Sequence, residues 1–115
     1  MITRRRWRGL TVRQLRTHRS RLARAVPDLE ATLGGALHRQ MRQCGKAGCR
    51  CADGELHGPY MYLSVRMGGG SRLLYVPAEA VNAVKRRVQV TGRIEAALAE
   101  ISAINLELLA RGELA

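Results

Sequence analysis

The sequence predicts an α+β fold in which an N-terminal basic helix precedes a loop, a small antiparallel β-hairpin and a long C-terminal helix. Apolar residues recur at helical spacing near the N-terminus, alternate on either side of a glycine turn in the middle, and return to helical spacing from residue 78. The 115 residues have room for one domain, or for a small core with helical arms. With one Trp, three Tyr and no Phe, that core must consist mainly of aliphatic side chains.

The first helix is expected over residues 11–26, with Thr11 as its N-cap. Its apolar positions are spaced three, seven and four residues apart, and arginines fill the other faces: Val12, Leu15, Leu22 and Val26. Pro27 and the acidic residues after it indicate either a break or the first turn of a second short helix. Gly34 and Gly35 end that segment.

The middle of the chain reads as extended structure interrupted by a loop. Residues 36–43 predict a short strand or an extended lead-in, and residues 43–59 have no hydrophobic period. Residues 59–66 alternate and are rich in β-forming side chains, residues 67–70 supply a glycine turn, and residues 71–77 return. We therefore predict a β-hairpin.

Residues 78–110 predict one long helix, bent near Thr91 and Gly92 if at all. Its apolar stripe ends with steps of four and three residues, the spacing of a coiled coil, and consists of Val81, Val84, Val88, Ile94, Leu98, Ile101, Asn105 and Leu108. In one interpretation Asn105 fixes the register of a helix pair, as in a homodimer through residues 78–110. In the other, the stripe packs on the N-terminal helix of the same chain.

The loop contains a cluster of metal-ligand residues with the spacing C-x4-C-x-C-x5-H: Cys44, Cys49, Cys51 and His57. Three thiolates and one imidazole match the ligand count of a closed, structural Zn²⁺ site, and the glycines between them permit tight turns. His38 or Asp53 could replace His57 as the fourth ligand. The alternative is that the cysteines are reactive or spare thiols.

The charge is strongly positive and unevenly distributed. The formal net charge is +11, and residues 1–26 contain nine arginines and no acid, whereas residues 77–115 contain five basic and five acidic side chains. Such a run favours contact with phosphates, because the planar guanidinium donates two parallel hydrogen bonds. The competing explanation is a biased composition with a solvated, arginine-rich tail.

Other classes of function find little support. No stretch is apolar enough to cross a membrane or to serve as a signal peptide, and three crowded cysteines suit metal binding in a reducing compartment, so a cytoplasmic protein is expected. No catalytic triad, phosphate-binding loop or convincing carboxylate pair is present, so neither enzymatic activity nor a small-molecule substrate is expected.

The motif C-G-K-x-x-C-R-C, followed by H-G-P-Y, a glycine turn and Y-V-P, resembles a family of small uncharacterised bacterial proteins over residues 34–109. Ala47 stands where that family tends to have proline. The resemblance implies a DNA-linked role, since such proteins are often found near transposase and other mobile-element genes, but it implies no established activity.

Together these patterns predict a zinc-stabilised DNA-binding protein with the role of a regulator or a mobile-element accessory. Residues 1–33 would form a basic helical arm, 34–77 the zinc knuckle and hairpin, and 78–115 the long helix, in one compact unit. The expected nucleic-acid contacts are Arg4, Arg5, Arg6, Arg8, Arg13, Arg16, Lys46, Arg50, Arg66 and Arg72. RNA ranks below DNA, because few aromatic stacking residues are available. The alternative is a zinc-stapled interaction module that dimerises through the C-terminal helix without nucleic acid.

Overall fold

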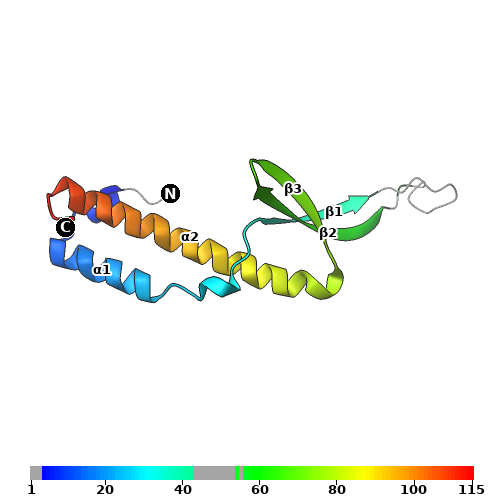
Figure 1. Cartoon of the computed structure of the whole chain (residues 1–115), viewed down its shortest axis with the longest axis horizontal. Coiled ribbons are helices and arrows are strands. Elements are labelled where there is room, and N and C mark those ends of the chain that lie inside the picture. Colours follow the sequence, from blue (N-terminus) through cyan, green and yellow to red (C-terminus); the bar gives the residue numbers. More distant parts are fainter. Residues whose placement is uncertain (1–3, 43–53, 55) are drawn as a thin grey trace. The chain divides into compact units, whose positions relative to one another are not determined.

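The computed structural model describes residues 4–42, 54 and 56–115. In chain order its elements are η1 (Arg4–Trp7), α1 (Val12–Arg24), η2 (Leu29–Ala31), β1 (Ala36–Arg42), β2 (His57–Met67), β3 (Gly70–Val76), η4 (Ala78–Ala80) and α2 (Val81–Ala110), as Figure 1 shows. The predicted α+β arrangement is confirmed. Two compact units are present: unit 1 contains Met1–Ala31 and Val90–Ala115, and unit 2 contains Thr32–Gln89.

The start of α1 follows from a capping box. The Thr11 hydroxyl accepts a hydrogen bond from the Gln14 backbone N–H at 3.1 Å, and the Gln14 side chain accepts one from the Thr11 N–H at 2.9 Å. These two bonds satisfy donors that a helix N-terminus otherwise leaves unpaired. The predicted N-cap is thus confirmed, and the predicted break after the helix contains the single 3-10 turn η2.

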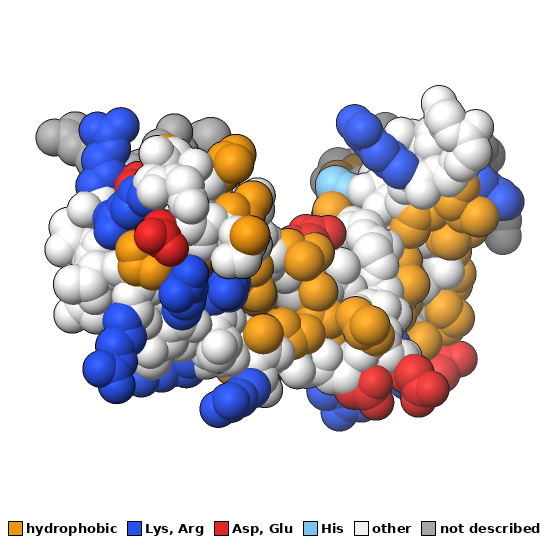
Figure 2. Space-filling view, turned by 60° about the vertical axis from the view of Figure 1, so that its left-hand side comes forward, with side chains coloured by type: hydrophobic (Ala, Val, Ile, Leu, Met, Phe, Trp, Pro, Cys, Tyr) orange, Lys and Arg blue, Asp and Glu red, His pale blue; other side chains and the backbone are white. Residues whose placement is uncertain are grey.

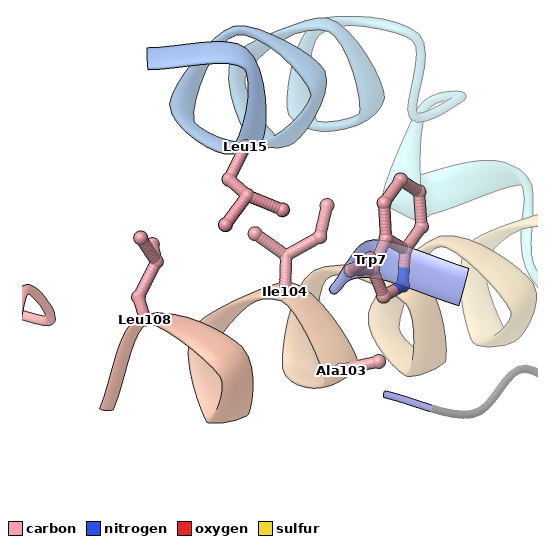
Figure 3. Packing of buried hydrophobic residues seen from close by; sticks show 5 residues of the cluster. All are labelled: Trp7, Leu15, Ala103, Ile104 and Leu108. Carbon is pink, nitrogen blue, oxygen red and sulfur yellow. The ribbon is translucent and has the colours of Figure 1, made fainter. Parts of the chain in front are cut away.

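The core of unit 1 lies where α1 runs antiparallel to the C-terminal part of α2 (Figure 1). Figure 3 shows Leu15 of α1 pointing toward Ile104 of α2, with Trp7 of η1 beside them. Leu15, Ile104 and Leu108 are completely buried, and Trp7 and Ala103 nearly so. Each such aliphatic side chain contributes about 1.5–3 kcal/mol when fully buried.

The predicted apolar stripe of the long helix coincides only partly with the residues of α2 that are buried. Leu108 is buried, but Leu98 is 62% exposed, while Ala103 and Ile104, outside the stripe, are buried. Leu, Ile and Ala occur on several sides of α2, so spacing alone did not determine which side faces α1. The long helix does pack on the N-terminal helix of its own chain, through a face rotated from the predicted one.

Arg111, just after α2, forms hydrogen bonds that join the N-terminal segment to the C-terminal end of α2. Its guanidinium donates to the carbonyl oxygens of Leu10 at 2.6 Å, Arg8 at 3.0 Å and Trp7 at 3.4 Å. Its Nε also donates to Glu107 Oε2 at 2.9 Å. One side chain therefore bonds three backbone acceptors of this segment, one of which, the Trp7 carbonyl, also accepts from the Leu10 N–H at 3.2 Å.

Unit 2 contains a three-stranded antiparallel sheet with the order β1-β2-β3. The predicted strand after Gly35 and the predicted hairpin are both confirmed, and the hairpin turns at Gly68 and Gly69, which have positive φ angles of 56° and 83°. Gly35 also has a positive φ, and a Cβ there would lie 2.6 Å from the Ser64 carbonyl oxygen. Only glycine fits this approach to β2 without strain.

Candidate nucleic-acid interface

The solvent face of α1 carries arginines separated by small polar side chains. Arg13, Thr17, Ser20 and Arg24 are spaced four, three and four residues apart, so they share one side of the helix, with Arg21 beside them. All five are exposed. The Thr17 hydroxyl donates a hydrogen bond to the Arg13 carbonyl oxygen at 3.0 Å. The small side chains leave room for an anion close to the helix between the longer guanidinium groups.

A shallow depression on this side of α1 has a volume of about 590 Å³ and is lined by Arg16, Thr17, Ser20, Arg21, Arg24 and Ala25. The helix contains no acidic residue. Among the described residues, Arg13, Arg21 and Arg24 make no ion pair or hydrogen bond through their guanidinium groups. These three cations are therefore available to an external anion.

Other arginines of the N-terminal region have partners within unit 1. Arg6 pairs with Glu100 at 2.9 Å, Arg16 pairs with Glu113 at 3.4 Å, and Arg19 donates to the Asn105 side-chain oxygen at 2.7 Å. Figure 2 shows blue basic side chains scattered over the part of the surface seen at the left, with red acidic ones next to some of them. The arginines thus divide into structural and available groups.

These pairings involve three residues to which the sequence analysis gave other roles. Arg6 and Arg16 were expected to contact phosphates, and each has a carboxylate partner. The Arg16–Glu113 pair is exposed on both sides, so it contributes only about 0–1 kcal/mol and can exchange, whereas Glu100, the partner of Arg6, is 18% exposed. Asn105 fixes the register of a helix pair in one of the two interpretations above, and in the structure its side-chain oxygen accepts a hydrogen bond from Arg19.

The remaining predicted contacts are spread widely. Arg8 is exposed, and Arg4 and Arg5 belong to η1. Arg66 and Arg72 are exposed on the hairpin, but Arg66 is paired with Ser71 and Arg72 with Val65, so the two arginines lie on opposite faces of the sheet. Lys46 and Arg50 lie outside the described residues.

The predicted zinc ligands Cys44, Cys49 and Cys51 also lie outside the described residues. His57 is the first residue of β2, is half-buried, and pairs across the sheet with Arg42, the last residue of β1. The two ends of the cysteine-containing loop are therefore brought together by strand pairing. Within the part of the chain that the structure describes, no group of three metal-ligand side chains occurs.

Arg21 and Arg24 were absent from the predicted contact set, as were Thr17 and Ser20. A helical projection would have found them, because the apolar positions place the opposite side of the helix at residues 13, 17, 20 and 24. The structural role of Arg19 had no such signal, since it depends on Asn105, which is 86 residues away in the sequence.

Comparison with known proteins identifies the family to which the chain belongs. No curated protein and no solved structure matches the chain significantly. None of the helices in the described part combines the length and apolar character needed to span a bilayer. A family model described as a domain of unknown function, DUF6788, matches residues 12–90, which include α1, the sheet and the first part of α2. Since this match covers well over half of the sequence, the protein belongs to the DUF6788 family.

Proposed function

We propose that this protein binds DNA through the exposed face of α1. The observation that carries the proposal is the set of three exposed arginines, Arg13, Arg21 and Arg24, on a helix without acids, with small hydroxyl side chains between them. The rise of an α-helix separates Arg13 from Arg24 by about 16 Å. Duplex DNA carries one charge per roughly 1.7 Å of its axis, so this length passes several phosphates.

Phosphate binding at this face requires little rearrangement. The three guanidinium groups lose no intramolecular partner among the described residues, and the packing of Leu15 against Ile104 holds the helix in place. Arg8 is also exposed, and Arg16 can join after exchanging its exposed partner Glu113 for a phosphate.

A structural zinc ion bound by Cys44, Cys49, Cys51 and His57 is the second part of the proposal. Its support is the ligand spacing together with the pairing of Arg42 and His57, which closes the ends of the loop. Elemental analysis of purified protein should give one zinc per chain, and Cys49→Ser should lower that content. A folded protein without zinc would refute this part.

The biological setting that we propose is that of a regulator or mobile-element accessory. The motif resemblance described above supports it, and the arginine face of α1 is compatible with it, because DNA backbone binding suits either role. The zinc ion would stabilise the protein and take no part in a reaction.

DNA binding is tested directly by titrating a fluorescent duplex with the full chain at several salt concentrations. Contact with phosphates predicts binding at low salt that weakens steeply as salt rises. The absence of binding at low salt, or an affinity independent of salt, would refute the proposal.

The second candidate function is a protein-interaction module that dimerises through α2. A specific observation favours it: Leu98, Leu106 and Leu109 are 62%, 47% and 58% exposed, and they line an apolar depression with Leu114 and Ile101. Native mass spectrometry distinguishes this candidate, because a dimer through this face should be lost in Leu98→Glu. A monomeric native chain would exclude it.

A further inference from the structure

One face of the sheet in unit 2 gathers the tyrosines of the chain. Residues paired across neighbouring strands share a face, and side chains alternate along each strand. His38 of β1, Tyr62 of β2 and Tyr75 of β3 are paired in one row, so they lie on the same side. We call this side the tyrosine face; it consists of His38, Gln40, Tyr60, Tyr62, Ser64, Arg66, Ser71, Leu73 and Tyr75, together with Arg42.

Side-chain contacts on the tyrosine face are consistent with this assignment. The rings of Tyr62 and Tyr75 meet edge to face with centroids 5.8 Å apart. The Arg42 guanidinium carbon lies 4.8 Å from the centroid of the Tyr62 ring. His38 Nε2 and Ser64 Oγ are 2.8 Å apart. The face is thus a preformed surface of aromatic rings bordered by cations.

The tyrosine face is also the less covered side of the sheet. The two buried residues of the strands, Leu63 and Val76, both lie on the opposite side. Tyr75 is 58% exposed, and Leu73 on the same strand is 49% exposed. Although the Tyr75 ring meets Tyr62 edge to face, more than half of the Tyr75 surface stays open to a ligand.

Charge selects the kind of ligand that suits this surface. None of the described side chains on the tyrosine face is acidic, and Arg42 and Arg66 add positive charge near its two ends along β1 and β2. Aromatic rings and arginines also occur in protein–protein interfaces. An acid-free platform with exposed rings and flanking guanidinium groups is better matched to bases joined by phosphates.

We infer that the tyrosine face binds single-stranded nucleic acid by stacking unpaired bases on Tyr75 and on the neighbouring tyrosines, with Arg42 and Arg66 contacting the phosphates. A base inside a duplex is already stacked on both sides, so this surface would select unpaired strands. The inference goes beyond the proposed function, because it concerns a second surface and a different form of nucleic acid from those assigned to α1.

The test uses the full chain and three fluorescent ligands: a thymidine oligonucleotide, a uridine oligonucleotide of the same length and a DNA duplex. Tyr75→Ala should weaken single-strand binding roughly five- to 100-fold, while Tyr75→Phe, which keeps the ring, should stay within about twofold of the native chain. Leu74→Ala is the matched control, because Leu74 is on the same strand but faces the other side of the sheet. The affinity of the Leu74→Ala variant for the single strands should not change.

Salt dependence separates stacking from charge. Tyr75→Ala should leave the slope of log affinity against log salt unchanged, whereas Arg42→Ala should reduce it by about 0.7, the value for one phosphate of a single strand. Circular dichroism of each variant confirms that the sheet is retained. Comparison of the thymidine and uridine ligands shows whether DNA or RNA is preferred.

Failure of this inference can be told apart from failure of the proposed function. Unchanged single-strand affinity in Tyr75→Ala, or an equal loss for duplex and single strand, would overturn the tyrosine-face assignment and leave duplex binding by α1 standing. Single-strand binding that depends on Tyr75, in a chain that does not bind duplex DNA, would support the tyrosine face and refute the α1 proposal. Binding to none of the three ligands would overturn both.

Discussion

Replacing Arg13, Arg21 and Arg24 together by alanine removes the available cations of α1 and little else. The three side chains are exposed and have no carboxylate partner among the described residues. Alanine is the best helix former, so α1 should be retained or slightly stabilised. Arg16 stays unchanged, because its pairing with Glu113 would confuse a binding effect with a packing effect.

The size of the effect follows from counterion release. Each phosphate neutralised on duplex DNA contributes about 0.9 to the slope of log affinity against log salt. Loss of three contacts should therefore lower the slope by about 2.7. Over a fourfold rise in salt, the native chain should lose roughly 40-fold more affinity than the triple variant.

The assay is fluorescence anisotropy of a labelled duplex at several salt concentrations. A matched control removes the same number of positive charges elsewhere: Lys85, Arg86 and Arg93 are exposed on α2 and can also be changed to alanine without loss of helix propensity. The control keeps the net charge equal to that of the α1 variant. Only the position of the lost charges differs between the two.

Equal slopes for the two triple variants would refute the reasoning. That result would mean that the chain responds to total charge, so that the spacing of arginines on α1 has no special role. A slope lowered by about 2.7 in the α1 variant and by less than about 1 in the control would support it.

Four further substitutions probe the packing, each measured by urea unfolding. Leu15→Ala should cost about 3–5 kcal/mol, because the side chain is fully buried, whereas Leu98→Ala, at a 62% exposed position, should cost less than about 1 kcal/mol; similar losses would contradict the assigned core. Gly35→Ala should cost about 1–3 kcal/mol, because its φ is +131° and the added Cβ would approach β2; an unchanged midpoint would argue against that approach. Arg111→Ala should cost about 3 kcal/mol through its lost hydrogen bonds, and a neutral result would show that the segment it contacts is held by other means.

Elements with local chemical signals could be predicted from the sequence. The capping residue Thr11 marks the start of α1, and the glycine turn at Gly68 and Gly69 marks the hairpin, because both signals act within a few residues. The side of α2 that packs on α1 could not be predicted. Leu98 and Ile104 are both aliphatic, and the difference in their burial depends on where α1 lies.

The candidate surfaces show the same division. An acid-free, arginine-rich helix was evident from the sequence, but the partners of Arg6 and Arg19 lie far along the chain and had no local signal. Alternation places Tyr60 and Tyr62 on one side of β2. The addition of Tyr75 to the same side requires the register between β2 and β3, which spacing in the sequence does not determine with certainty.

The hydrogen bonds of Arg111 can form only after residue 111 has been synthesised. Its bond to the Leu10 carbonyl joins residues 101 positions apart. The arginine-rich segment is therefore made about 5–20 s before the residues that hold it, at ordinary rates of elongation. An isolated helix of 13 residues is only marginally stable in water. A chain interrupted before Ala103 would carry all nine N-terminal arginines but would lack the packing that stabilises α1. Such a chain could attract polyanions, but it could not present the surface proposed for DNA.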